Sequence, residues 1–143
     1  MPSIGVIQRM KIATALFASA CAIAPNAIAM NAHAMDARIR SQLAKLDPQT
    51  RLEQRCDMEA MDRIKAAGKG YQPDKVIAYS FGDPKTIGNK LKTEGAVFRS
   101  KGEWYRLAFK CETSDDHFDV TAFKYRIGDM VPRDDWDAHY LYD

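Results

Sequence analysis

The sequence predicts an α+β fold in which N-terminal helices pack on one face of a small antiparallel sheet of about four strands. Two patterns favour this fold. Between residues 47 and 67 apolar side chains recur at three- and four-residue steps, as on one face of a helix, whereas between 96 and 127 they alternate with polar ones, as in strands. Because each pattern leaves one apolar face, the sequence predicts a two-layer sandwich of helix on sheet.

The helices come first in the predicted domain. Residues 35–46 have apolar side chains at helical spacing and are expected to form a short helix. Asp47 is a suitable N-cap and Pro48 suits the first helical position, so a second helix is expected to start there. It should end at about residue 67, because the GKG run at 68–70 follows. Its apolar stripe consists of Leu52, Cys56, Ala60, Ile64 and Ala67.

The strands are predicted after Pro73. A β-rich run at 75–81 precedes a turn at 82–85, and residues 86–95 are expected to form a loop with at most a short edge strand. At Pro132 the chain is expected to begin a helical turn with acidic residues in it. Three further strands, joined by hairpin turns, are predicted at 96–100, 103–112 and 117–127.

Alternation along the strand at 103–112 separates a core face from an outer face. The side chains predicted to face the core are Tyr105, Leu107, Phe109 and Cys111. The outer face is basic and includes a tryptophan, which suits an anionic partner such as a lipid head group, an acidic glycan or an acidic protein. An ordinary solvated sheet face rich in Lys and Arg would look the same, so both interpretations stay open. The candidate binding face comprises Arg99, Trp104, Arg106, Lys110, Lys124 and Arg126.

Cys56 and Cys111 lie on the apolar faces of the long helix and of this strand. In an oxidising compartment two such thiols form a disulfide, so the sequence predicts a bond between helix and sheet. A metal site would need further Cys or His at ligand spacing, and a reactive thiolate would need an exposed, electropositive site with a histidine partner. A free buried thiol remains the alternative.

Residues 1–34 are expected to be a cleaved secretory signal. Basic residues precede an apolar run at 12–24, and small-x-small cleavage sites end at Ala29 and Ala34. The run is too short for a comfortable membrane span, which needs roughly 20 apolar residues. An Ala-Ser-Ala-Cys sequence ending at Cys21 loosely resembles a lipobox, so lipidation is an alternative. The signal predicts a periplasmic or secreted protein.

The expected mature domain, 35–143, has no net charge. The chain has 21 Lys and Arg against 19 Asp and Glu, and two of the basic residues lie in the predicted signal. A neutral domain argues against nucleic acid as a partner, because nucleic-acid-binding domains are usually basic. No transmembrane span is expected in this domain.

No catalytic residues, metal site or cofactor are predicted. The polar run from Ser114 to Asp119 contains His117, but its Asp and Ser are turn-forming residues, and a hydrolytic triad needs side chains that converge. His139, in the C-terminal segment, is expected to have a surface or packing role. Glycine-rich phosphate-binding motifs with the required spacing are absent.

Several long runs resemble one bacterial family. They are LDPQTRLEQRCDMEAMDRI, PDKVIAYSFGDPK, GAVFRSKGEWYRLAFKCETSDDHFDV and IGDMVPRDDWDAHYLYD, and together they extend from residue 46 to the end. The chain is similar in these runs to domain of unknown function 930, a family typical of alphaproteobacteria. The resemblance implies a small exported envelope domain with two cysteines, and it implies no catalytic or ligand-binding residues.

The functional hypothesis from the sequence is therefore a non-enzymatic binding or interaction domain of the cell envelope, with an envelope protein or an anionic envelope ligand as partner. Two alternatives stay open. One is an envelope hydrolase, which would need His117, His139 or a pair of carboxyl groups in a shared cleft. The other is a secreted inhibitor that inserts the predicted loop at 82–95 into a target enzyme.

Overall fold

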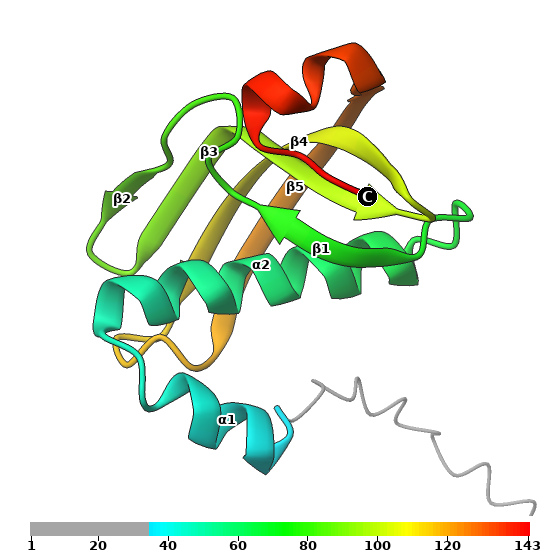
Figure 1. Cartoon of the computed structure of the whole chain (residues 1–143). Coiled ribbons are helices and arrows are strands. Elements are labelled where there is room, and N and C mark those ends of the chain that lie inside the picture. Colours follow the sequence, from blue (N-terminus) through cyan, green and yellow to red (C-terminus); the bar gives the residue numbers. More distant parts are fainter. Residues whose placement is uncertain (1–34) are drawn as a thin grey trace, which may run out of the picture. The chain divides into compact units, whose positions relative to one another are not determined.

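The computed structural model describes residues 35–143 (Figure 1). The predicted signal at 1–34, with Cys21 and the cleavage sites at Ala29 and Ala34, lies outside the described residues. Two α-helices precede an antiparallel sheet of five strands, which confirms the predicted α+β fold. Two short 3-10 helices follow. The elements are α1 (Ala37–Leu43), α2 (Pro48–Ala66), β1 (Pro73–Ile77), β2 (Lys85–Ile87), β3 (Lys90–Ser100), β4 (Glu103–Thr113), β5 (Val120–Met130), η1 (Arg133–Asp135) and η2 (Asp137–His139).

Helix α2 begins and ends where its capping residues predict. The Asp47 carboxylate accepts hydrogen bonds from the Thr50 backbone N–H at 3.1 Å and from the Thr50 hydroxyl at 2.6 Å. These bonds, the hydroxyl first, lower the pKa of Asp47 below its usual value. At the other end the helix stops at Ala66, and Gly68 adopts a left-handed conformation. Ala67, predicted on the apolar stripe, is exposed at the C-cap.

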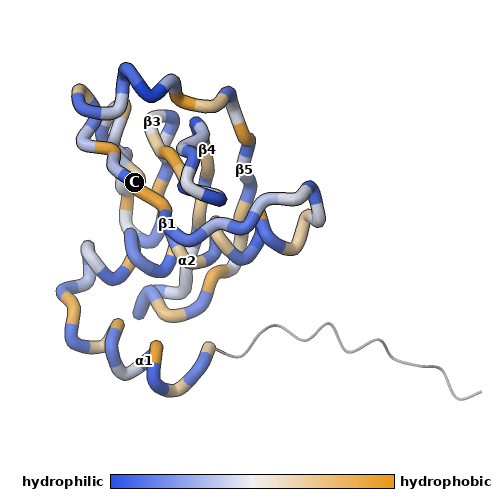
Figure 2. Tube along the Cα trace, turned by 45° about the vertical axis from the view of Figure 1, so that its right-hand side comes forward, coloured by the Kyte–Doolittle hydropathy of each residue, from blue (hydrophilic) through white to orange (hydrophobic). Residues whose placement is uncertain are grey.

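The strands form a sheet in the order β1-β3-β4-β5. Along one edge of β3, β2 pairs with residues 90–92 and β1 pairs with residues 97–100. All pairings are antiparallel, and β3, β4 and β5 are each 11 residues long. Figure 2 shows both hydrophobic and hydrophilic residues along β5. Phe123, Tyr125 and Ile127 are half-buried and the residues between them are exposed, as expected for a sheet with one face in the core.

The prediction of a loop with at most a short edge strand at 86–95 is wrong for residues 90–95. Residues 85–87 form β2, and the remainder forms the first half of β3, which Gly88 and Asn89 connect to β2 in a tight hairpin. Gly88 has a φ of 56°, a conformation typical of such turns. Leu91 and Thr93 are buried, whereas the residues between and beside them are exposed. This alternation places one side of the segment in the core and makes it a strand.

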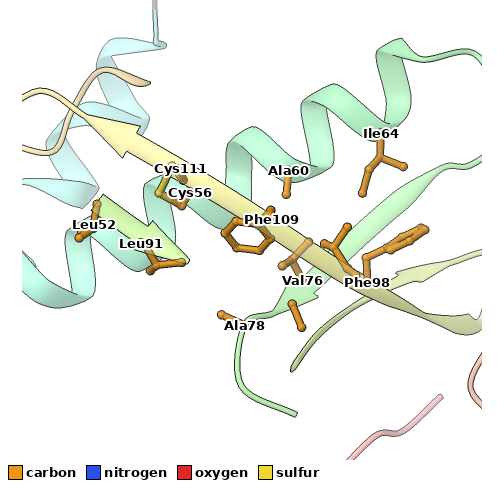
Figure 3. Close-up of a cluster of buried hydrophobic side chains, with 12 residues drawn as sticks. Leu52, Cys56, Ala60, Ile64, Val76, Ala78, Leu91, Phe98, Phe109 and Cys111 are labelled. Carbon is orange, nitrogen blue, oxygen red and sulfur yellow. A yellow bond between two sulfur atoms is a disulfide. The ribbon is translucent and has the colours of Figure 1, made fainter. Parts of the chain in front are cut away.

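The core lies between α2 and one face of the sheet (Figure 3). The α2 side chains of the predicted stripe, apart from Ala67, point at Phe109 and its neighbours, and Leu52 and Ile64 are fully buried. Burying each such side chain stabilises the fold by about 1.5–3 kcal/mol. The buried cluster comprises Leu52, Cys56, Ala60, Ile64, Val76, Ala78, Leu91, Ala96, Phe98, Leu107, Phe109 and Cys111.

A disulfide joins Cys56 of α2 to Cys111 of β4, as predicted. The two Cα atoms are 5.9 Å apart, within the usual range for a disulfide, and both residues are buried in the core cluster. The bond therefore fixes the middle of the long helix to a central strand, 55 residues later in the chain.

The C-terminal segment covers part of the opposite sheet face. Val131, Trp136 and Leu141 pack there against Val97 and Trp104 in a second buried cluster. The indole N–H of Trp104 donates to the Tyr142 carbonyl at 2.9 Å, and that of Trp136 donates to the Val131 carbonyl at 3.1 Å. The predicted helical turn after Pro132 is confirmed, and it belongs to a third, partial layer.

Gly95 allows the loop after β1 to approach β3. The Phe81 N–H donates to the Gly95 carbonyl at 2.8 Å, and a Cβ at Gly95 would lie 2.5 Å from the Gly82 nitrogen. We expect Gly95→Ala to lower the free energy of unfolding by about 3 kcal/mol, because backbone rather than a flexible side chain must move. Urea unfolding measures this. Gly70→Ala, which has open space around it but a left-handed φ of 82°, should cost only about 1 kcal/mol; an equal loss in both variants would contradict the steric argument.

Candidate functional site

The structure divides the predicted basic face into two halves. Trp104 lies beneath the C-terminal segment, Arg99 lies near Tyr142 of that segment, and Arg106 lies over the Phe81 ring. The other three residues, Lys110, Lys124 and Arg126, remain exposed. The prediction of an exposed aromatic on this face is wrong, because Trp104 has 0% of its surface accessible. The reason is the C-terminal segment, which covers the half of the outer face that carries Trp104 and Val97.

Arg99 and Arg106, the two arginines of the predicted face that are only partly exposed, are held within the domain in different ways. Arg99 donates to the two carboxylate oxygens of Asp74 at 2.9 and 3.1 Å. This hydrogen bonding lowers the pKa of Asp74. The guanidinium of Arg106 lies 3.8 Å from the centre of the Phe81 ring. The charge of Arg99 is thus paired within the domain, whereas Arg106 has only the contact with Phe81, and its buried Nε has no hydrogen-bond partner within the described residues.

The exposed half contains a row of four lysines. In the strand register Lys85 of β2 is opposite Lys92 of β3, Lys92 is opposite Lys110 of β4, and Lys110 is opposite Lys124 of β5. Directly opposite residues in antiparallel strands point to the same face, so one lysine row crosses four adjacent strands. With strands about 4.8 Å apart, the row is about 14 Å wide.

Few acidic side chains compensate this row. Lys92 pairs with Glu94 at 3.2 Å, and Arg126 reaches the same carboxylate at 3.5 Å. Within residues 35–143, Lys85, Lys110 and Lys124 have no carboxylate within ion-pair distance. Like charges directly opposite each other destabilise a sheet by about 0.2–1 kcal/mol per pair, so the row opposes folding.

An exposed isoleucine lies next to the lysine row. Ile87 of β2 is opposite Lys90, one of the exposed lysines that flank the row, and 81% of Ile87 is accessible to solvent. Thr86, between Lys85 and Ile87, accepts a hydrogen bond from Gln49 of α2 and so faces the helix side. Ile87 therefore projects on the same outer face as the lysines.

The histidines have separate structural roles. His117 lies in the β4–β5 turn with its Nδ1 3.0 Å from the Thr113 hydroxyl, and His139 donates from Nδ1 to the Ser80 carbonyl at 2.9 Å. The structure thus places them on different elements. Around His117, Ser114 donates to Asp116 at 2.6 Å, which confirms the predicted turn. In the part of the chain that the structure describes, no three His, Cys, Asp or Glu side chains gather as metal ligands.

A family model, Domain of Unknown Function (DUF930), matches residues 43–141. The chain belongs to this family. The match extends from the end of α1 to Leu141 and so includes both cysteines, the whole sheet and the C-terminal segment. It confirms the resemblance seen in the sequence. No curated protein and no solved structure matches the chain. Among residues 35–143 of this DUF930 protein, no helix is both long and apolar enough to cross a bilayer.

Sequence reasoning missed two members of the lysine row in this DUF930 domain. Lys85 and Lys92 fall in the segment 82–95, which was assigned to a turn and a loop. The signal was present as alternation in KLKTE at 90–94, preceded by a Gly-Asn pair that suits a tight hairpin. That pattern places lysines on the outer face, but only the pairing of strands aligns them in one row.

Proposed function

We propose that this DUF930 protein is an exported, non-enzymatic binding domain of the cell envelope whose lysine row contacts the anionic surface of a membrane. The single observation that carries the proposal is the alignment of Lys85, Lys92, Lys110 and Lys124 across four strands. An arrangement that opposes folding is retained where it serves binding.

Export is supported by the buried disulfide and by the signal pattern in residues 1–34. Stable disulfides form in oxidising compartments and are rare in the bacterial cytoplasm. The Cys56–Cys111 bond is a core bond rather than an exposed redox pair, because both cysteines are almost fully buried. We therefore place the protein in the periplasm, where it meets anionic lipid head groups.

A membrane surface fits the shape and chemistry of the face. Strands β2 to β5 present the lysines from a sheet rather than from a cleft. Each lysine close to an anionic bilayer contributes about 1 kcal/mol to binding. Ile87 projects beside the row and adds an apolar side chain that can enter the head-group boundary.

The enzyme alternative meets one of its conditions, because the carboxyl groups of Glu53 and Asp57 line one groove with His139. The histidines argue against a hydrolytic triad. Nδ1 of each histidine is already used, by the Thr113 hydroxyl and by the Ser80 carbonyl, so neither ring is oriented by a carboxylate in the manner of a triad. The inhibitor alternative has less support, because residues 85–87 and 90–95 belong to strands and not to the loop that was expected to insert into a target enzyme.

The test is co-sedimentation of the oxidised, exported protein with vesicles that contain phosphatidylglycerol. Replacing Lys85, Lys110 and Lys124 together by glutamine should weaken binding by about 3 kcal/mol, roughly 100-fold, since three charges near the surface are lost. Binding of the unmodified protein should fall as salt is raised, because exposed charges are screened.

A matched control replaces Lys45, Lys65 and Lys69, which are exposed elsewhere, by glutamine. It makes the same change in net charge and should leave binding within about twofold, since those side chains are not on the sheet face. Equal losses in the two triple variants would mean that net charge alone drives binding. No sedimentation with anionic vesicles, together with binding to an acidic polysaccharide, would move the proposal to that partner class.

A further inference from the structure

A groove of about 610 Å³ lies on a different part of the domain from the lysine row. Its walls come from α2, from β1 and the residues that follow it, and from the C-terminal segment. In Figure 1, β1 runs between α2 and the C-terminal end of the chain. The volume lies in the range typical of sites for small organic ligands, about 300–1,000 Å³.

Asp57 is a nearly buried acid that lines this groove. Only 6% of it is accessible, and its Oδ1 has no hydrogen-bond partner within the described residues. The hydroxyl of Ser80, which also lines the groove, is likewise buried and without a hydrogen-bond partner within the described residues. Because an unpaired buried carboxyl group is costly, it calls for a ligand group that it can bind.

The nearest charges add to the negative potential at Asp57. Glu53 is one helical turn earlier on the same face of α2 and also lines the groove. Burial first, and then repulsion from Glu53, raise the pKa of Asp57 well above its usual value. Burial also raises the pKa of Glu53.

The other charged groups that line the groove have partners of their own, and the partner of Lys75, Tyr142, also lines the groove. Lys75 is hydrogen-bonded to the Tyr142 hydroxyl, and its ammonium lies 4.5 Å from the centre of that ring. Asp74 is bound by Arg99. His139 donates to the Ser80 carbonyl and stacks on Phe81 at 3.6 Å. No basic side chain within residues 35–143 therefore pairs with Asp57 or Glu53.

Most of the uncharged side chains that line the groove are apolar or aromatic. Met58 and Met61 come from α2, Tyr79 comes from the loop after β1, and Tyr140 comes from the C-terminal segment. Tyr79 is 58% exposed and Tyr140 is 88% exposed, so both rings are accessible to a ligand. Aromatic faces attract ammonium groups, and methionine side chains adapt to varied apolar shapes.

We propose that this groove binds a small organic cation, an amine with an apolar or aromatic body, with Asp57 as the counter-ion of its ammonium group. The amine donates to Oδ1 of Asp57, Glu53 adds long-range attraction, and the body of the ligand lies against the methionines. The proposal goes beyond the membrane contact, because none of its residues belongs to the lysine row. A lysine side chain of a partner protein would offer the same ammonium chemistry.

The test is to titrate the oxidised protein with 2-phenylethylamine. Calorimetry measures the affinity, and NMR chemical shifts of the backbone amides show which residues are affected. We expect binding with shifts at groove residues, and binding at least about tenfold weaker for 2-phenylethanol, which has no charge. Asp57→Asn should weaken amine binding by about tenfold or more, and Glu53→Gln by less. The tripeptide glycyl-lysyl-glycine tests whether the groove instead binds a lysine side chain of a partner protein. If the tripeptide binds more tightly than the amine, the small-molecule assignment is overturned.

Asp62→Asn is the matched control, because Asp62 is an exposed acid on the same helix outside the groove, and it should leave binding unchanged. Asp57→Asn is expected to fold, and at neutral pH to be more stable than the unmodified protein. Folding raises the pKa of this carboxyl group, so the free energy of unfolding falls as pH rises from the pKa in the unfolded state to the pKa in the folded state. An amide does not ionise, so the Asn variant does not lose this stability.

The pH dependence separates an ion pair from simple apolar binding. Because Asp57 must be ionised to pair with the ammonium group, affinity should increase as pH rises through the raised pKa of Asp57 and then level off. The Asp57→Asn variant should lack this rise. Equal affinity for amine and alcohol, no effect of Asp57→Asn, or no amine binding at millimolar concentration would each overturn the proposal.

Discussion

Replacing Cys56 and Cys111 together by alanine is expected to lower the free energy of unfolding by about 4 kcal/mol. The disulfide closes a loop with a sequence separation of 55 residues, and a cross-link of that length removes much of the conformational freedom of the unfolded chain. Domains of this size are stable by only about 5–15 kcal/mol in total, so the loss is a large fraction of the stability.

Urea unfolding, followed by far-UV circular dichroism, measures this loss. Reduction of the unmodified protein with dithiothreitol is the matched control, because it breaks the bond while both buried sulfur atoms keep their volume. The reduced protein should lose a similar amount, and the difference between the two gives the cost of the missing side-chain volume. Unfolding midpoints that are the same for the oxidised and reduced protein would refute a stabilising role for this bond.

The second large effect is expected at Trp104, where Trp104→Ala should cost about 4 kcal/mol. Trp104 is fully buried and is one of two tryptophans in the cluster beneath the C-terminal segment. Its removal leaves a cavity against Val131, Trp136 and Leu141, and it also removes the hydrogen bond to the Tyr142 carbonyl. The C-terminal segment should therefore detach from the sheet.

Tryptophan fluorescence reports this detachment directly. Trp136 is the only other tryptophan, so in Trp104→Ala its emission should shift to the red as it becomes hydrated. Trp104→Phe keeps most of the packing and should show little shift, with a loss of about 1–2 kcal/mol. Tyr79→Ala, which removes an aromatic ring that is 58% exposed, should stay within about 0.5 kcal/mol. An unshifted Trp136 in Trp104→Ala would contradict the proposed anchoring role.

The local patterns predicted a large share of the fold. The stripe on α2 and the alternation on β4 each depend on near neighbours in the chain, so their buried faces were visible in the sequence. The disulfide followed, because both cysteines lie on those faces. The loop assigned to 86–95 failed for a related reason, since Leu91 and Thr93 alone gave too weak an apolar signal beside Lys90 and Lys92.

The candidate sites were less predictable. Alternation identified Lys110 and Lys124 as outward-facing, but it gave the same direction to Trp104, which the C-terminal segment then buries. Asp57 received no functional assignment, because a carboxyl group next to Cys56 on a charged helix is indistinguishable by pattern from a solvated one. Only the tertiary structure shows that it is buried and that it lines a groove together with residues after β1 and of the C-terminal segment.

The sequence by itself determined the helix, the main strands, the family and the pair of cysteines, because each depends on the order of residues over a short stretch or on residue type. The tertiary structure alone decided which lysines share a row, that Trp104 on the outer sheet face is covered and where the acidic groove forms. These depend on strand register and on contacts between residues that are far apart in the chain, and a periodic pattern carries no information about either.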